Sequence, residues 1–363
     1  MSANHPVRAS NASQRVYLRR IALLLVTALV IGACTSLPPQ TPQTRGPAPS
    51  QTAGSIPTAA LPTEPSAAIP TEAVSPTPAV PVFPCGEPDP TCESLVVTTQ
   101  QGIPFTSPVA CGADGATCIL RLDSFAPPTA KRLPVVVMIP GGPVAPGIRE
   151  YLWTLARLVA WRGAVVFTAD YRSGPQWGGG YPQTFADVAC AIAFARGNAA
   201  ALGGDPSHIT LLAHSFGGFP GSVTSLSTHD FSVDAPECQA AAADGRPDAF
   251  VGVGAIYGFD HIGADFLKQM LGGTRDEVPE AWDGTDITVL VASKGHPSPP
   301  VRLLAGTSDP VAPITTAAEF ASILRSAGID VTVTSVDGAT HDSILTKQLT
   351  LDTIATFLGV TGY

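Results

Sequence analysis

The stretch that decides the fold is Ile209-Thr210-Leu211-Leu212-Ala213-His214-Ser215-Phe216-Gly217-Gly218. Its first half is apolar and favours β-structure, and its second half is a serine followed by small residues. We therefore expect a buried strand that turns sharply into a helix at Ser215, the layout called a nucleophile elbow. Such a turn exposes the serine hydroxyl at the edge of a sheet. Ala213 stands where the G-x-S-x-G pattern has glycine, and alanine is still small enough for strand and helix to pass closely.

Strand and helix signals alternate on both sides of this stretch. Strands are expected at 95–98, 118–122, 134–139, 164–169, 209–214, 250–257, 301–305 and 330–335, and helices at 148–162, 181–202, 313–328 and 343–358. Alternation of this kind predicts an α/β fold with a doubly wound, mostly parallel sheet. The segment 258–300 interrupts the rhythm, and we expect it to form a small cap over the strand ends.

Two further residues complete the chemistry that a serine nucleophile needs. Its hydroxyl requires a neutral imidazole as base and a carboxylate that orients the imidazole. Asp309 follows the strand at 301–305, and His341 follows the strand at 330–335. The carboxyl ends of parallel strands meet at one edge, so Ser215, Asp309 and His341 are expected to converge there as catalytic residues.

Each of the three residues also has a simpler interpretation. Ser215 alone fits a helix cap, Asp309 a turn residue and His341 a loop histidine. Their arrival in the order Ser, Asp, His, each after its own strand, favours the catalytic interpretation. Asp260, Asp337 and Asp342 are rival orienting carboxylates and rank below Asp309. The remaining histidines considered, His208, His214 and His296, are expected to be structural or surface residues.

An oxyanion that forms on the substrate needs backbone N–H donors. The amide of Phe216, directly after the nucleophile, is expected to be one donor. The loop Ile139-Pro140-Gly141-Gly142-Pro143 should supply the other, and Gly142 is the best candidate because Pro143 has no N–H. Pro220 lies early in the helix after the elbow, where we expect it to remove a backbone hydrogen bond.

From about residue 131 to residue 363 the sequence resembles the α/β-hydrolase superfamily, in particular bacterial esterases and lipases of the hormone-sensitive-lipase and dienelactone-hydrolase-like groups. Three stretches carry the resemblance: Pro140-Gly141-Gly142, Ala169-Asp170-Tyr171-Arg172, and Gly203-Gly204-Asp205-Pro206 leading to His214-Ser215-Phe216-Gly217-Gly218. The resemblance implies an α/β-hydrolase fold and hydrolysis of carboxylic esters through a serine acyl-enzyme. It also implies that no metal or organic cofactor takes part, and that Asp-Tyr-Arg supports the architecture of the site.

These observations favour a serine carboxylesterase acting on small-molecule or polymer esters. An amidase or peptidase would use the same three residues, and a non-catalytic binding lipoprotein could use the same fold. Trp177, Tyr181 and Phe219 either line a substrate pocket or belong to core and cap packing. The net charge of −9, without a Lys/Arg-rich stretch, argues against nucleic acid as a partner.

The N-terminal segments point to export. Arg15, Arg19 and Arg20 precede an apolar run at 21–33, and small residues lead into Cys34. This layout predicts a lipoprotein signal at 1–33, with Cys34 lipidated and the protein at the cell surface or facing the periplasm, held to a membrane. Ordinary secretion stays open. Residues 34–84 are rich in Pro, Thr, Ser and Ala, which predicts a disordered tether before a domain at 85–363.

Six of the seven cysteines remain if Cys34 is lipidated. An even number in an exported chain suggests disulfides, and six cysteines allow fifteen pairings. The equal, close spacings favour local bridges in the leading region 85–130, Cys85 with Cys92 and Cys111 with Cys118, which leaves Cys190 with Cys238. Metal binding is the rival interpretation, but C-x6-C is wider than a typical zinc site.

Overall fold

The structure of the chain is a computed structural model that describes residues 97–112, 115–128, 132–142, 148–240 and 244–360. The expected signal segment, the tether, Cys34, Cys85, Cys92 and Pro143 lie outside these residues.

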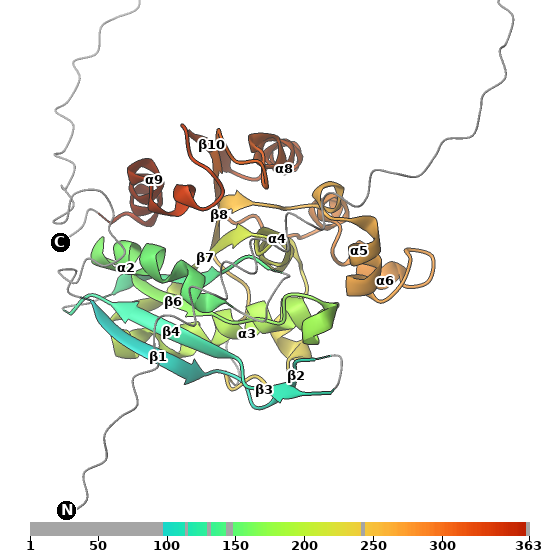
Figure 1. Ribbon diagram of the computed structural model, residues 1–363, viewed down its shortest axis with the longest axis horizontal. Coiled ribbons are helices and arrows are strands. Elements are labelled where there is room, and N and C mark those ends of the chain that lie inside the picture. The colour runs from blue at the N-terminus through green and yellow to red at the C-terminus, as the bar shows by residue number, and fades with distance from the viewer. Residues whose placement is uncertain (1–96, 113–114, 129–131, 143–147, 241–243, 361–363) are drawn as a thin grey trace, which may run out of the picture. The chain divides into compact units, whose positions relative to one another are not determined.

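One eight-stranded sheet organises the described residues (Figure 1). In spatial order its strands are β1 (Thr98–Pro104), β4 (Arg121–Ala126), β6 (Val165–Ala169), β5 (Leu133–Ile139), β7 (Gly204–Ser215), β8 (Ala249–Ala255), β9 (Val301–Gly306) and β10 (Val331–Val336). From β6 to β10 every pairing is parallel, whereas β4 pairs antiparallel with both β1 and β6. The expected mostly parallel sheet is confirmed.

The leading strands differ from the prediction. The first strand begins at Thr98, where the predicted one ends, and the mostly polar, largely exposed residues 98–104 form an edge strand of the sheet. The predicted strand at 118–122 is divided: Cys118 ends a short hairpin of β2 (Val109–Ala110) and β3 (Thr117–Cys118), and β4 begins at Arg121. A Cys111–Cys118 disulfide closes the hairpin, as expected from the spacing.

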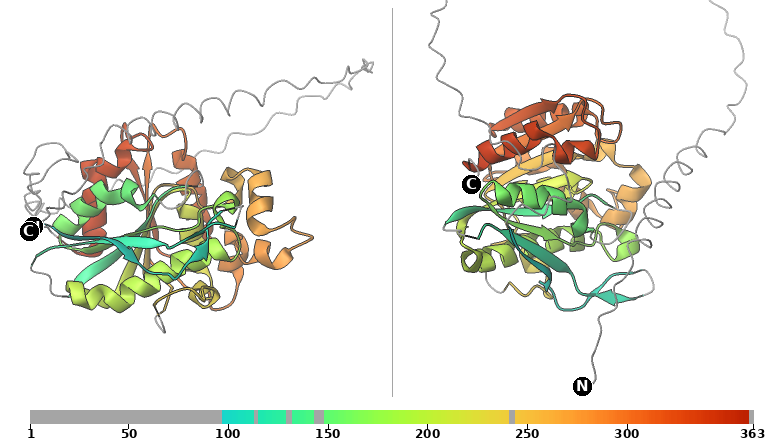
Figure 2. Two further views of the ribbon diagram at one scale, coloured as in Figure 1. Left: turned by 60° about the horizontal axis from the view of Figure 1, so that its bottom comes forward. Right: turned by 60° about the vertical axis from the view of Figure 1, so that its left-hand side comes forward.

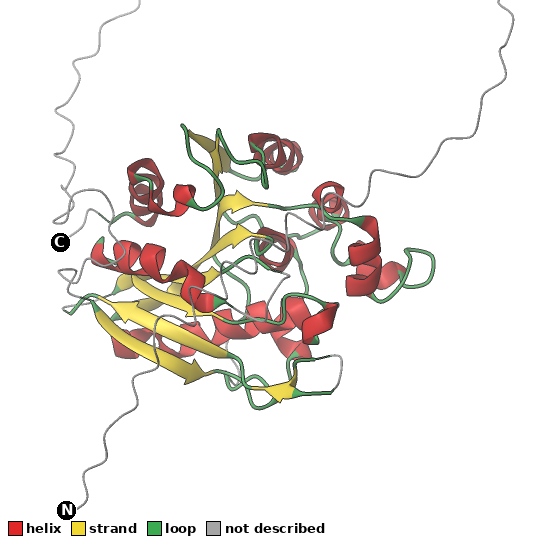
Figure 3. Cartoon of the chain, in the orientation of Figure 1, coloured by secondary structure: helices red, strands yellow, loops and turns green. Residues whose placement is uncertain are grey.

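Helices cover both faces of the sheet, as Figure 3 shows. One face carries α2 (Trp153–Trp161) and α9 (Gln348–Leu358). The other carries α3 (Gln183–Asn198), α4 (Gly218–Leu226) and α8 (Ile314–Ser326). The central strands are apolar on both faces because both faces are covered. Short 3-10 turns also occur: η1 (Arg149–Leu152), η2 (Pro175–Trp177), η3 (Ala199–Leu202), η4 (Phe231–Asp234) and η6 (Ser343–Thr346).

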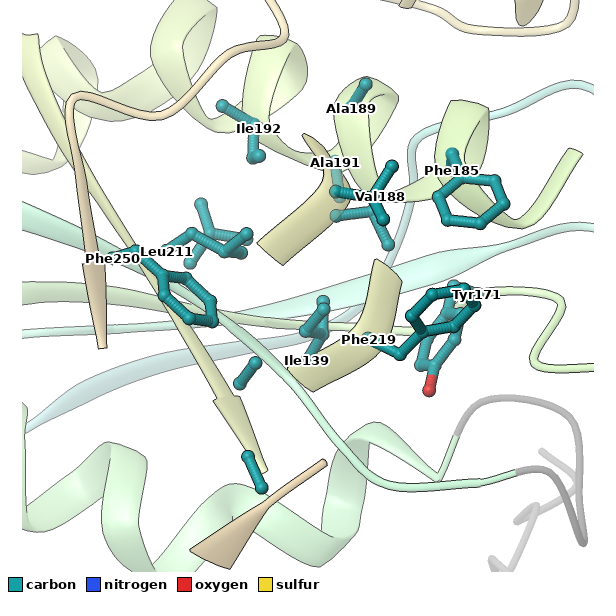
Figure 4. Close-up of a cluster of buried hydrophobic side chains, with 14 of the residues drawn as sticks. Ile139, Tyr171, Phe185, Val188, Ala189, Ala191, Ile192, Leu211, Phe219 and Phe250 are labelled. Carbon is teal, nitrogen blue, oxygen red and sulfur yellow. The ribbon is translucent and has the colours of Figure 1, made fainter. Parts of the chain in front are cut away.

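Helix α3 packs deeply against the sheet. Figure 4 shows Phe185, Val188 and Ile192 of this helix beside sheet and α4 residues, among them Leu211 and Phe219. The stretch 183–202 is apolar and long enough to cross a membrane, but 61% of its most apolar part is buried inside the protein. We therefore assign it to the core. The Cys190–Cys238 disulfide, expected from the cysteine count, ties α3 to the loop after η4.

The segment 258–300 forms short helices that the sequence analysis did not predict. They are η5 (Phe259–His261), α5 (Ala264–Leu271), α6 (Pro279–Asp283) and α7 (Ile287–Ala292). Figure 2 shows this orange segment gathered on one side of the fold. The Phe266 ring of α5 contacts Phe216, the residue after Ser215, edge to face at 5.6 Å between ring centroids. The insertion therefore reaches the elbow.

Candidate active site

The elbow at Ser215 has a strained backbone. Its φ of +56° lies in the left-handed region, which costs a non-glycine residue on the order of 1–3 kcal/mol. Hydrogen bonds hold the turn: the Gly217 N–H donates to the His214 carbonyl at 3.0 Å, and the Ile256 N–H donates to the Ser215 carbonyl at 3.0 Å. The turn directs the serine side chain out of the sheet, as the strand-to-helix pattern predicts.

Small residues let the elbow close. A Cβ on Gly217 would lie 2.5 Å from the Pro140 carbonyl oxygen, so glycine is required there. Ala213, at the first position of the motif, faces Gly221 of α4, where a Cβ would lie 3.2 Å from the Ala213 Cβ. The absence of a side chain at Gly221 of the helix therefore leaves room for the Ala213 methyl group in the strand.

The expectation about Pro220 is wrong. Helix α4 begins at Gly218, which places Pro220 in the first turn. The first backbone bond of α-helical spacing runs from the Gly221 N–H to the Gly217 carbonyl at 2.9 Å, one residue after the proline. Helix N–H groups before that point have no partner within the helix, so Pro220 removes no hydrogen bond.

The structure brings the three predicted catalytic side chains together. His341 Nε2 lies 2.8 Å from Ser215 Oγ, and His341 Nδ1 lies 2.9 Å from Asp309 Oδ2. Because a carboxylate can only accept, Nδ1 carries the proton and donates to Asp309. Nε2 is then bare and accepts the Ser215 hydroxyl proton, which is the tautomer that a general base requires.

Both oxygens of the Asp309 carboxylate accept hydrogen bonds. Its side chain is wholly buried. Its Oδ1 accepts the N–H groups of Val311 at 2.8 Å and Ala312 at 2.9 Å, which leaves Oδ2 to His341. The loop after β9 thus fixes the carboxylate with Oδ2 toward the imidazole.

The rival carboxylates lie elsewhere. Asp337 accepts from the Thr307 hydroxyl, Asp342 accepts from the Tyr151 hydroxyl, and Asp260 is exposed on η5. Of the four carboxylates considered, only Asp309 bonds His341.

The two glycines of the predicted oxyanion loop have different neighbours. A Cβ on Gly141 would be 2.6 Å from Ser215 Cβ, whereas one on Gly142 would be 2.6 Å from Ser173 Cβ. The peptide that joins them therefore runs from the side of Ser215 toward Ser173. The Phe216 N–H has no hydrogen-bonding partner among the described residues, so it is available to a substrate.

The Asp-Tyr-Arg stretch after β6 braces this loop. The buried Tyr171 hydroxyl donates to the Pro140 carbonyl at 3.0 Å. Arg172 forms a bidentate, buried ion pair with Asp187 of α3, with both N–O distances at 2.8 Å. Asp170 accepts from Arg149 of η1 at 2.9 Å, and burial raises the pKa of Asp170 to about 6 against the pull of Arg149. These contacts anchor the segments on either side of the oxyanion loop.

The three aromatic candidates for pocket lining differ in their surroundings. Phe219 is fully buried and packs on Phe185 and Phe216. Tyr181 packs on Phe185 and Phe231. Trp177 is half-buried in η2. Phe219 and Tyr181 therefore belong to core packing.

Four residues at the site were given no role there by the sequence analysis. Gly141 and Gly254 make close approaches, and Tyr151 and His214 lie beside the His341 loop. His214, expected to be structural or a surface residue, is buried with its ring centroid 4.7 Å from that of His341. The position of His214 next to Ser215 could have indicated in the sequence that it lies at the site. No such signal marks Tyr151, because its partner Asp342 is 191 residues away.

The profile of the BD-FAE family matches residues 122–324, more than half of the chain. This chain belongs to the BD-FAE family. The family is one of α/β hydrolases similar to hormone-sensitive lipase, so the resemblance inferred from the sequence is confirmed. Within the residues that the structure describes, no three His, Cys, Asp or Glu side chains gather as a metal-binding group.

Curated relatives of this BD-FAE chain are esterases. Esterase LipC of Mycobacterium tuberculosis is 30% identical over 210 residues, which are 54% of this chain and 49% of LipC. Esterase LipQ of the same organism is 26% identical over 259 residues, 69% of this chain and 60% of LipQ. The chain thus spans about half to three fifths of the length of these relatives.

A solved structure shows the same fold. The thermophilic esterase of Thermogutta terrifontis with butyrate bound is 24% identical and superposes with a TM-score of 0.54, covering 70% of this chain and 94% of that one.

Proposed function

We propose that this BD-FAE chain is a serine carboxylesterase. The observation that carries the proposal is the continuous hydrogen-bonded line from Ser215 Oγ through His341 to Asp309, with separations of 2.8 and 2.9 Å. The tautomer is the productive one, and the strained elbow holds the hydroxyl at the edge of the sheet. The esterase relatives support carboxylic esters as the substrate class.

In the proposed reaction, Ser215 Oγ attacks the ester carbonyl carbon while its proton passes to His341 Nε2. Asp309 stays ionised and stabilises the imidazolium. The carbonyl oxygen becomes an oxyanion that accepts from the Phe216 amide and from the Gly142 amide. His341 then gives its proton to the alkoxy oxygen, the C–O bond breaks, and the alcohol leaves an acyl-serine. Water attacks this ester with His341 again as base, His341 returns the proton to Ser215 Oγ as the acyl C–O bond breaks, and the carboxylic acid is released.

Hydrolysis of p-nitrophenyl esters of two to twelve acyl carbons tests this function, with the matching p-nitroanilides measured in parallel. We expect ester turnover by the wild-type protein and its loss in Ser215→Ala, to the level left by binding alone. Faster anilide than ester turnover would indicate an amidase, and no turnover of either would favour a binding protein. The acyl length that gives the highest kcat/KM would define the acyl preference.

We also propose that the chain is exported and anchored by a lipid on Cys34, as the run of apolar and small residues before that cysteine indicates. Cells that express the full chain would incorporate a palmitate analogue into the wild-type protein and not into Cys34→Ser. Equal labelling of both would contradict the anchor.

A further inference from the structure

Three side chains that the proposed reaction does not use form linked contacts beside the main chain of His341. His214 Nε2 lies 3.1 Å from the His341 carbonyl oxygen. Tyr151 stacks on His214, with ring centroids 5.5 Å apart and 30° between the planes. The Tyr151 hydroxyl donates to the carboxylate of Asp342, the residue after His341. We call Tyr151, His214 and Asp342 the histidine clamp.

The protonation state of His214 follows from its partner. A carbonyl oxygen can only accept, so Nε2 of His214 must carry the proton. Its Nδ1 is buried and has no hydrogen-bonding partner among the described residues. Burial, and then the neighbouring His341, lower the pKa of His214 to about 4. At neutral pH the ring is therefore an uncharged donor.

The charged and titratable groups that face His214 come from three elements. His341 and Asp342 belong to the loop after β10, Asp309 to the loop after β9, and Tyr151 to η1. A neutral His214 adds no like charge beside the imidazolium that His341 becomes during the reaction. A protonated His214, 4.7 Å away between ring centroids, would repel it.

The clamp closes a ring of contacts across distant parts of the chain. Tyr151 joins His214 by stacking, His214 joins the His341 carbonyl, and Asp342 joins the Tyr151 hydroxyl. The hydrogen bonds that His341 forms with Asp309 and Ser215 involve its imidazole and not its main chain. A hydrogen-bonded imidazole can still drift with its backbone, and a drift of about 1 Å costs on the order of 100-fold in rate.

We propose that Tyr151, His214 and Asp342 are positioning residues that fix the main chain of His341, so that Nε2 stays at hydrogen-bond distance from Ser215. This inference rests on the proposed serine esterase function. It assigns to the histidine beside the nucleophile a role in orienting the base rather than in packing alone.

Two substitutions of His214 test the proposal, because one keeps only its planar ring and the other keeps only a hydrogen-bond donor. His214→Phe keeps a planar ring and removes the donor, whereas His214→Gln supplies an amide donor without the ring. We expect His214→Phe to lower kcat on a p-nitrophenyl ester about tenfold or more, with KM within about twofold. His214→Gln should recover most of the loss. His208→Gln, an exposed histidine on the same strand, is the matched control and should behave as wild type.

A second variant keeps the test decisive if His214→Phe fails to fold. Tyr151 is 41% exposed, so Tyr151→Phe should fold and retain the stacked ring while losing the bond to Asp342. We expect about a fivefold to tenfold loss of kcat with KM unchanged. The second-order rate of inactivation by a fluorophosphonate should fall in parallel, because it depends on the same base.

Three outcomes would overturn the proposal. Wild-type kcat in Tyr151→Phe, or in a folded His214→Phe, would show that the clamp positions nothing. Losses that fall on KM, or that His214→Gln does not rescue, would indicate packing alone. Absence of both ester turnover and fluorophosphonate labelling in the wild-type protein would instead overturn the esterase function, and the clamp with it.

Discussion

Gly254 lies directly against Asp309. A Cβ at position 254 would be 3.2 Å from Asp309 Oδ2 and 3.8 Å from His341 Nδ1, and the backbone there has a φ of +50°. The end of β8 therefore leaves space for the hydrogen bond that orients the imidazole. Two independent constraints, conformation and space, favour glycine at this position.

Gly254→Ala should accordingly lower kcat/KM about tenfold to 100-fold, because the methyl group pushes on the Asp309–His341 pair. The left-handed backbone should add about 1–2 kcal/mol of destabilisation. Gly328→Ala is the control, since it has a φ of +77° and open space around its Cβ. Gly328→Ala should lose about the same free energy of unfolding in urea as Gly254→Ala and should keep full activity. Equal activity of the two variants would contradict the steric account.

Gly141→Ala tests the oxyanion loop. Its methyl group would lie 2.6 Å from Ser215 Cβ and 2.9 Å from Oγ, so the loop must shift away from the nucleophile. We expect kcat/KM to fall by about 100-fold or more, the loss typical of a missing oxyanion donor. Gly197→Ala, in α3 with no atom within 4 Å of its Cβ, should keep full activity and gain slightly in stability. Retained activity in Gly141→Ala would place the oxyanion donors elsewhere.

Much of the site was predictable because it follows from strand order. Ser215, Asp309 and His341 each come after a strand, and parallel strands bring such loops to one edge. The clamp could not be predicted in this way, since it joins η1 to a loop 191 residues away. The contact of Gly141 with Ser215 could not be predicted, because a pattern of glycines does not say which one lies beside the serine. The short helices of 258–300 lack the long periodic runs on which prediction depends.

The two described disulfides should differ in their effect on stability. The chain-entropy argument gives about 4 kcal/mol for Cys190–Cys238, which closes 48 residues, and about 2 kcal/mol for Cys111–Cys118, which closes 7. Double alanine variants of each pair, unfolded in urea, would measure the difference. Ester turnover at 25 °C should persist in both, because neither bridge includes or bonds Ser215, His341 or Asp309. A larger loss for the hairpin bridge would contradict the argument.

Burial of His214 should make the fold sensitive to acid. Its pKa is lowered to about 4 in the folded protein, and it titrates near 6.5 when unfolded. Between these values the unfolded state binds the extra proton, so stability is fully present above pH 6.5 and is lost as the pH falls toward 4. The loss reaches about 3 kcal/mol at most.

Comparison with His214→Gln isolates this effect. Asp170, whose pKa is raised to about 6, acts in the opposite direction: the folded state binds its proton first, so its contribution falls as pH rises from about 4 to 6. The contribution of Asp170 to the pH dependence is the same in the wild-type protein and in His214→Gln. Urea unfolding at pH 7 and pH 5 should therefore show a smaller pH difference in His214→Gln than in wild type. An unchanged difference would mean that His214 does not govern the acid response.

The most direct test of the account is the site of covalent modification by a fluorophosphonate. The reagent loses fluoride to an activated serine, and mass spectrometry of the digested protein locates the phosphonyl group. We predict a single adduct on Ser215 in the wild-type protein, none in Ser215→Ala, and labelling slowed by several orders of magnitude in His341→Ala. No adduct on the folded wild-type protein, or an adduct on a different serine, would contradict the assignment of Ser215 as the nucleophile.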